Sequence, residues 1–402
     1  MSENIVISDL QKQIFEKLSK NETNEFKQLI THIKSTVNFV DENGMSPLQH
    51  ACSKGNIEAV KILLDQGADV NFNQHGANYT SLHFAALSGN KDICNLLLDA
   101  GIIPTTLNSV SRTASQMAAF VGNYTCVEAI NNYVPKAQIE QFTKIQGNQK
   151  EPCLPPQLLD SFHKFVIEVN LHPVRIALNL QRNGNLIKHL PKLKKVLQLM
   201  TEKEMHKKCD INELMAFKYH YLRWTISEIM RCEEQCQLRK EKNNDSDGKH
   251  DFIELFVKRV LKENKQGQLE YVEFTIRDCV REFPFRECTI FRQVVSQLAN
   301  KDSPPALFVL RSAINGQRGF IDEISFCSTC GEEKPDKKCS KCKAVQYCDR
   351  ECQRLHWFMH KKTCARPTSA AVNSNHLSGT AENKHDIDAG EIQETLKNLV
   401  VS

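Results

Sequence analysis

The stretch "MSPLQHACSKGNIEAVKILLDQGADVNF" (residues 45–72) decides how the first third of this chain folds. It contains a short apolar segment, a Gly-Asn pair and a second apolar segment, each with the spacing of one helix face. Related stretches follow at 79–103 and 112–134, and the three Gly-Asn pairs begin 34 and 33 residues apart. Because a unit this small cannot bury its own apolar face, the period predicts stacked helix pairs.

The three units resemble ankyrin repeats, whose first helix carries the pattern Thr-Pro-Leu-His-x-Ala. The first unit has Ser-Pro-Leu-Gln-His-Ala at 46–51 and the second has Thr-Ser-Leu-His-Phe-Ala at 80–85, whereas the third keeps little of the pattern. The resemblance implies three repeats over 44–135 and a helical capping repeat over 1–43. It also implies a surface that binds other proteins.

Two residue types in the repeats have expected structural roles. Gly44, Gly67 and Gly101 stand where turns require a positive φ. His83, at the histidine position of the pattern, is expected to hold a turn together by side-chain hydrogen bonds rather than to take part in catalysis.

The region 153–312 is predicted to be all-helical, because apolar residues recur there at helical spacing. The segment 211–230 is apolar on more than one side. The pattern leaves open whether this region continues the repeat stack or forms a bundle. A loop at 243–254 comes close to the ligand spacing of a calcium-binding EF-hand, and a solvated polar loop is the alternative interpretation.

Seven cysteines and two histidines lie between residues 327 and 364. The spacing is C-x2-C, eight residues, C-x2-C, five residues, C-x3-C, seven residues, H, three residues, C. Thiolate and imidazole groups are preferred zinc ligands, so eight of them predict two tetrahedral zinc sites. Both sites are closed by four protein ligands, which is typical of structural rather than catalytic zinc.

This spacing resembles that of MYND zinc fingers over 327–364. The resemblance implies two cross-braced sites, in which the first and third ligand pairs share one ion and the second and fourth share the other. The implied ligands are Cys327, Cys330, Cys348 and Cys352 for zinc 1, and Cys339, Cys342, His360 and Cys364 for zinc 2. His356 is not expected to be a ligand, because seven residues, instead of three, separate it from the last cysteine.

The same resemblance implies a site for a short proline-containing peptide. Its residues are Gln353 and Trp357, which share one helix face because they are four positions apart. The alternative is that Trp357 only packs over the zinc core.

The remaining composition indicates a protein of a reducing compartment, in the cytoplasm or nucleus. Nine further cysteines are scattered and expected to be reduced and mostly buried. The net charge of +4 is too small to indicate a nucleic-acid partner, and neither a signal peptide nor a membrane span is expected. The polar segment 367–388 is expected to be disordered, and 389–402 to form a short helix.

The whole chain is thus predicted to be mainly α-helical: a repeat solenoid, a helical middle, a small two-zinc finger and a tail. This order resembles the ankyrin repeat and MYND domain-containing proteins of the shorter type. The resemblance implies a non-enzymatic adaptor with no catalytic residue, a cytoplasmic location and a link to the cilium through trafficking of signalling proteins. The alternatives are a nuclear factor that recruits corepressors and, less favoured, a lysine methyltransferase with the finger inside its catalytic domain. The oligomeric state is not indicated.

Overall fold

The structure is a computed structural model of the chain, and it confirms a mainly helical fold. It describes residues 2–33, 37–147, 149–183, 185–207, 211–243, 251–300, 303–316 and 325–364. The chain divides into two compact units, Met1–Met117 with Thr363–Ser402, and Ala118–Lys362. The predicted tail at 367–388, the predicted helix at 389–402 and most of the loop at 243–254 lie outside the described residues.

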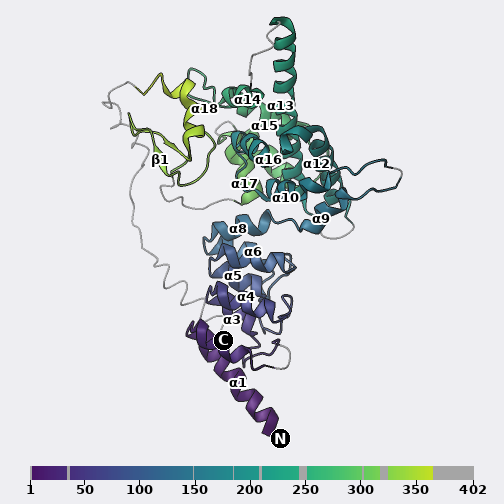
Figure 1. The fold of residues 1–402 in the computed structure, drawn as a ribbon, viewed down its shortest axis with the longest axis vertical. Helices are drawn as coiled ribbons and strands as arrows, with labels where there is room; N and C mark the ends of the chain where they lie inside the picture. The colour runs from purple at the N-terminus through teal and green to yellow at the C-terminus, as the bar shows by residue number, and fades with distance from the viewer. Residues whose placement is uncertain are drawn as a thin grey trace. The chain divides into compact units, whose positions relative to one another are not determined.

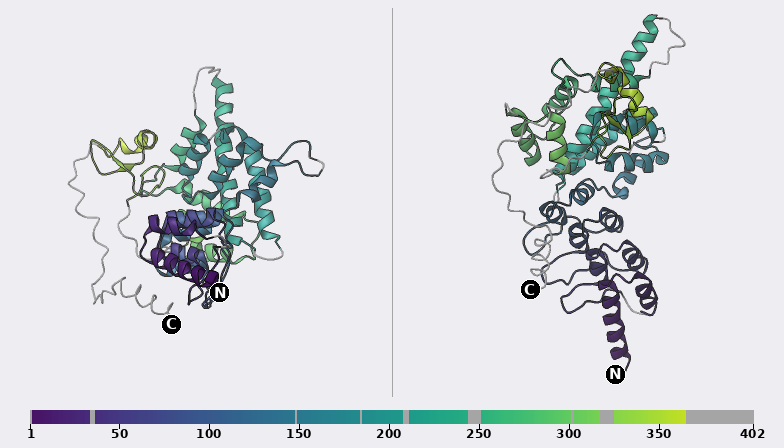
Figure 2. Two further views of the ribbon diagram at one scale, coloured as in Figure 1. Left: turned by 60° about the horizontal axis from the view of Figure 1, so that its bottom comes forward. Right: turned by 90° about the vertical axis from the view of Figure 1, so that its left-hand side faces the viewer.

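The first unit contains the helix pairs that the period predicts. Its helices are α1 (Ser2–Ser19), α2 (Thr23–Ile30), α3 (Pro47–Ser53), α4 (Ile57–Asp65), α5 (Ser81–Leu87), α6 (Lys91–Asp99) and α7 (Ala114–Phe120), whose last residues fall in the second unit. α3 contacts both α1 and α5, and α4 contacts both α2 and α6. The pairs are therefore stacked in sequence order, as Figures 1 and 2 show.

Local sequence explains where these helices begin. Ser46 and Thr80 each form a capping box with the residue three positions later, which satisfies otherwise unpaired N–H groups of the first turn. Asn56 caps α4 by accepting from Ala59, and Asn90 caps α6 in the same way. In each Gly-Asn pair the glycine has a positive φ after the first helix, and the asparagine then starts the second.

His83 has the structural role expected of it. Its Nδ1 accepts from the backbone N–H of Thr80 at 3.2 Å, and its Nε2 lies 3.1 Å from the carbonyl oxygen of Arg112. The side chain is buried, which lowers its pKa and favours the neutral ring. The histidine thus joins the start of α5 to the loop before α7.

The second unit is a helical bundle that carries the finger. Its helical elements are α8 (Tyr124–Asn131), α9 (Lys136–Glu140), η1 (Gln141–Thr143), η2 (Pro156–Leu158), α10 (Leu159–Ile167), α11 (Pro173–Arg182), η3 (Leu186–His189), α12 (Leu190–Met205), α13 (Glu213–Asn243), α14 (Phe252–Val260), α15 (Glu270–Arg281), α16 (Thr289–Ala299), α17 (Ala306–Asn315) and α18 (Arg350–His360). α13 contacts α11, α12, α14, α15, α16 and α17. A helix that is apolar on several sides must be covered by other helices on those sides. The middle region therefore forms a bundle and does not continue the repeat stack.

A buried polar network crosses this bundle. The ammonium group of Lys218 donates to Asn132 Oδ1 at 2.7 Å and to the carbonyl oxygen of Glu168 at 2.8 Å. Asn132 donates to Asn315 Oδ1, and Asn315 donates to the carbonyl oxygen of Val169. Burial lowers the pKa of Lys218 to about 7. The network ties α8, α13 and α17 to the segment that follows α10.

The described cysteines outside the finger are mostly buried, as expected, and form no disulfide bond. Cys153 is half-buried, and the other described members of the set are buried: Cys52, Cys94, Cys126, Cys232, Cys236, Cys279 and Cys288. Burial raises the pKa of Cys52 and Cys279, so these thiols stay protonated and behave as small apolar side chains. Cys209 lies outside the described residues.

Among the helices that the structure describes, none has the length and apolarity that a bilayer crossing requires.

Candidate metal centre and the surface around it

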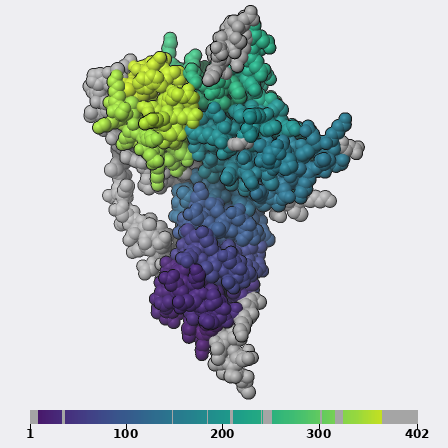
Figure 3. Space-filling model, in the orientation of Figure 1, coloured from purple at the N-terminus to yellow at the C-terminus, as the bar shows by residue number. Residues whose placement is uncertain are grey.

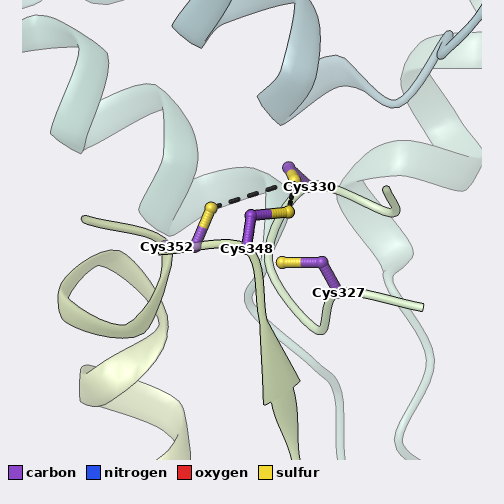
Figure 4. Close-up of side chains that lie close together, drawn as sticks. All are labelled: Cys327, Cys330, Cys348 and Cys352. Atoms are coloured by element: carbon purple, nitrogen blue, oxygen red, sulfur yellow. Dashed lines mark hydrogen bonds between the residues drawn. The ribbon is translucent and has the colours of Figure 1, made fainter. Parts of the chain in front are cut away.

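Two groups of four ligand atoms form within the finger. One contains Cys327, Cys330, Cys348 and Cys352, and the other contains Cys339, Cys342, His360 and Cys364. The ligand atoms of each group lie within 4.8 Å of one another. Figure 4 shows the first group, whose four sulfur atoms converge from two segments of the chain. The arrangement has the interleaved order that the resemblance implied.

The spacing of these atoms fits zinc. A Zn–S bond of about 2.3 Å in a tetrahedral site places neighbouring sulfur atoms about 3.8 Å apart. The Cys330 sulfur lies 3.5 Å from that of Cys348 and 3.8 Å from that of Cys352 (Figure 4). In the second group His360 Nε2 lies 3.4 Å from the sulfur atoms of both Cys339 and Cys342. The two groups are therefore suited to two structural zinc ions.

The first two cysteine pairs sit on similar turns. After Cys330 the chain reverses at Gly331, which has φ +66° and donates its N–H to the Cys327 carbonyl oxygen. After the second pair Lys343 has φ +56° and donates in the same way to Cys339. A left-handed residue directly after the second cysteine therefore closes each turn.

A short hairpin and one helix bring in the remaining ligands. Strands β1 (Lys337–Lys338) and β2 (Gln346–Tyr347) pair antiparallel, and each is followed directly by a cysteine of a different group. Asp349 then caps α18 by accepting from the Cys352 N–H at 2.7 Å. Thr329 of the first turn donates to the Cys352 carbonyl oxygen at 2.6 Å. These contacts fix the start of α18 against the first cysteine turn.

The two histidines of α18 have different surroundings. His360 belongs to the second group of ligands, whereas His356 lies outside both and its Nδ1 lies 3.0 Å from the Tyr347 hydroxyl oxygen. Burial lowers the pKa of His356, so its ring is neutral at pH 7. In the second group, the Cys342 backbone N–H lowers the pKa of Cys339 to about 6, with help from His360 and against the effect of burial.

The finger is docked on the helical bundle by polar contacts. Asn170 donates to the carbonyl oxygen of Cys330 at 3.1 Å and to the Glu332 carboxylate at 2.8 Å. Arg182 of α11 pairs with Asp349 at 2.9 Å and also with Glu351, both at the start of α18. In Figure 3 the yellow-green surface of the finger lies directly against the teal surface of the bundle. The finger and the bundle thus form one packed unit.

Replacing Asn170 with alanine is expected to loosen the first cysteine turn. The change leaves the buried Cys330 carbonyl without this donor, and a lost buried hydrogen bond costs about 1–3 kcal/mol. Faster amide hydrogen exchange over 327–332 would show it. Asn43→Ala, the same change at an exposed position in the first unit, should leave this exchange unchanged. Equal exchange in both variants would contradict a role for Asn170 in docking.

Gln353 and Trp357 lie on α18 as the spacing predicts. Trp357 is 45% exposed, and its ring also contacts the His360 ring edge-on, with centroids 5.9 Å apart. Gln353 is half-buried. Trp357 therefore both covers part of the second zinc site and presents an open aromatic surface.

The docking residues were not found from the sequence. Asn170 lies in an ordinary-looking polar segment after α10, and Arg182 is one charged residue among many. Their partners lie about 160 residues away along the chain, so only the folded structure brings them together.

Two known sequence families match separate parts of the chain. The sequence model "Ankyrin repeats (3 copies)" matches residues 17–108, and the model "MYND finger" matches residues 327–364. The first match begins inside α1, so the segment predicted as a cap is itself repeat-like, and the third predicted unit, 112–134, lies entirely beyond the match. Fold and site together define an ankyrin-repeat protein with a MYND finger.

Whole-chain similarity narrows the class to one family. Dauer abnormal formation protein 25 of Caenorhabditis elegans is 30% identical over 360 residues, which are 88% of this chain and 89% of that protein. The chain belongs to the ankyrin repeat and MYND finger family of this protein.

Two further relatives share only part of the chain. Human SH3 and multiple ankyrin repeat domains protein 2 is 30% identical over 33% of this chain and 7% of its own length. The transient receptor potential channel pyrexia of Drosophila melanogaster is 35% identical over 26% of this chain and 11% of its own length. Similarity this partial carries no information about the function of the whole chain.

Proposed function

We propose that this protein is a non-enzymatic adaptor that binds one protein through its repeats and another through its finger. Two different interaction modules in one chain support this, together with the half-exposed Trp357 on the finger helix. The proposed second partner is a short proline-containing peptide, bound at Gln353 and Trp357. Proline segments are often recognised by aromatic surfaces, because their extended form loses little entropy on binding.

In this proposal the two zinc ions only build the peptide-binding surface. Zinc 1 is bound by Cys327, Cys330, Cys348 and Cys352, and zinc 2 is bound by Cys339, Cys342, His360 and Cys364. With four protein ligands at each ion, no position is left for a reacting water or substrate.

The proposed location is cytoplasmic, with the adaptor acting in the trafficking of signalling proteins to the cilium. Family resemblance is its support. The alternative is a nuclear factor that recruits corepressors through the finger. Imaging of the tagged chain in ciliated cells separates the two, because accumulation in the nucleus alone would favour the alternative.

Replacing Trp357 with alanine is expected to weaken peptide binding about tenfold, because the ring supplies exposed aromatic surface. The zinc content should stay at two, since the indole is not a ligand. Calorimetric titration with proline-containing peptides, together with zinc analysis, checks both statements. Phe274→Ala removes an even more exposed aromatic ring from α15 and should change neither. Unchanged binding by the Trp357 variant would leave the ring only its packing role.

Capture of partners from cells tests the adaptor as a whole. Three baits are compared: the intact chain, Trp357→Ala, and a chain lacking residues 1–110, which retains α8 and its contact with α17. An adaptor requires that the two altered baits lose different sets of proteins. Loss of the same set by both would mean one composite site, and the bridging proposal would be wrong.

A further inference from the structure

A cavity of about 260 Å³ lies on the helical bundle, away from the finger. It is formed by α12 and α13, and its lining contains three cationic side chains and one acidic one. The lining residues are Lys194, Arg223, Trp224, Ser227, Met230, Arg231 and Glu234. A cavity with such a lining favours an anion.

Arg223 is held in place without losing its charge. Its guanidinium donates to His220 Nδ1 at 3.4 Å, and His220 Nε2 donates to the carbonyl oxygen of Cys279 at 2.9 Å. Burial lowers the pKa of His220 to about 4, so this ring is neutral at pH 7. The neutral ring of His220 orients Arg223 but does not compensate its positive charge, as a carboxylate would. Lys194 likewise has no carboxylate partner within the described part of the chain.

Arg231 lines the cavity about two turns further along α13. Its guanidinium lies over the Trp224 ring, 5.8 Å from the centroid, and pairs with Glu228. Glu228 also accepts from the hydroxyl of Tyr271 at 2.9 Å. The charge of Arg231 is thus compensated, so an entering ligand meets two further cations, Lys194 and Arg223, and one carboxylate, Glu234.

Trp224 lines the same cavity, and its indole N–H is an unpaired donor. This nitrogen is buried and has no hydrogen-bond partner among the described residues. An indole N–H is a donor only, and a buried donor without an acceptor is unfavourable.

We propose that this cavity binds a phosphate group, carried either by a small soluble molecule or by a phosphorylated side chain of a peptide. Arginine and lysine donors recognise phosphate oxygens strongly, and a phosphate monoester carries a charge of about −1.5 to −2 at pH 7. The volume suits one phosphate and the part of the molecule next to it. The site is distinct from the repeats and from the finger, and it gives the bundle a ligand of its own.

The chain has two tryptophans, so Trp357→Phe leaves Trp224 as the only indole emitter. Inorganic phosphate titrated into the full-length zinc-loaded Trp357→Phe chain, at constant ionic strength, is expected to change the Trp224 emission saturably. Lys194→Met and Arg223→Met, each made in this background, should raise the half-saturating concentration about tenfold, or about 1.4 kcal/mol. Blocked phosphoserine as a second probe separates the two sources, because tighter binding than phosphate indicates a peptide.

Lys195→Met is the matched control, since it removes the same charge one position along α12 from an exposed residue that does not line the cavity. It should leave the titration unchanged. Thermal unfolding of every variant without phosphate checks that each is folded. Absence of a saturable signal in the parent chain, or an equal loss in the Lys195 variant, would overturn the proposal.

Discussion

Cys339→Ser is expected to reduce the bound zinc below two per chain and to unfold the finger. The segment has few apolar side chains, so metal binding supplies its folding free energy, about 10–16 kcal/mol for comparable finger peptides. Serine offers an oxygen instead of a soft thiolate and cannot replace the ligand. Zinc analysis of the purified chain measures the loss, and hydrogen exchange over 327–364 measures the unfolding.

Because the two zinc sites are cross-braced, loss of either site is expected to unfold the whole finger. Each zinc site joins the first half of the finger to the second half, so Cys327→Ser should have the same effect as Cys339→Ser. If each site instead held only its own half, one substitution would leave the other half protected from exchange. Protection of the buried residues of α3 to α6 should not change in either variant, since these helices form their own stack.

The control for both substitutions is Cys153→Ser, which makes the same chemical change at a half-buried cysteine outside the two groups. It should keep two zinc ions. Retention of both ions by the Cys327 or Cys339 variant would show that the ligand assignment is wrong.

Unfolding of the finger should also destabilise the part of the bundle that contacts it. The side chain of Asn170 donates hydrogen bonds to finger residues, and that of Arg182 forms an ion pair with one. Both segments therefore lose polar partners when the finger unfolds. Increased exchange over 168–172 is therefore expected in the zinc-ligand variants. This effect would not follow if the finger were an independent module on a linker.

The features predicted from sequence are those that local spacing encodes. The Gly-Asn period fixes a turn and a helix start in each repeat, through a positive φ at Gly55 and a cap at Asn56. The ligand spacing of the finger fixes its metal chemistry, because a closed set of thiolates and imidazole has few other uses. In both cases residues close in sequence carry the information.

The features that sequence did not predict depend on distant contacts. To predict the bundle around α13, one must know which faces of its six neighbouring helices contact it. Amphipathic spacing shows that a helix has an apolar face but does not show which helix packs against that face. The docking of the finger joins Asn170 to Cys330, and the phosphate cavity joins Lys194 of α12 to Arg223 of α13. A charged residue in a helix pattern looks the same whether it faces water, a partner or a cavity.

Gly44→Ala is expected to destabilise the first unit by about 2–4 kcal/mol, by combining backbone strain with overpacking. Gly44 has φ +75°, a conformation that is strained for an L side chain. A Cβ atom there would lie 2.3 Å from the backbone carbonyl oxygen of Gln74, in the turn of the next repeat. Backbone cannot move aside as a flexible side chain can, so successive turns would have to separate.

Gly67→Ala separates the two causes. Gly67 has φ +82°, yet a Cβ there would meet nothing within 4 Å, so only the strain of about 1–2 kcal/mol remains. The free energy of opening, from native-state hydrogen exchange of the buried amides in α3, compares the two variants. A larger loss for Gly44→Ala means that the turns of neighbouring repeats must touch for the array to be stable. Equal losses would mean that the turns can separate freely, and a binding surface formed by several of them would then lack a fixed shape.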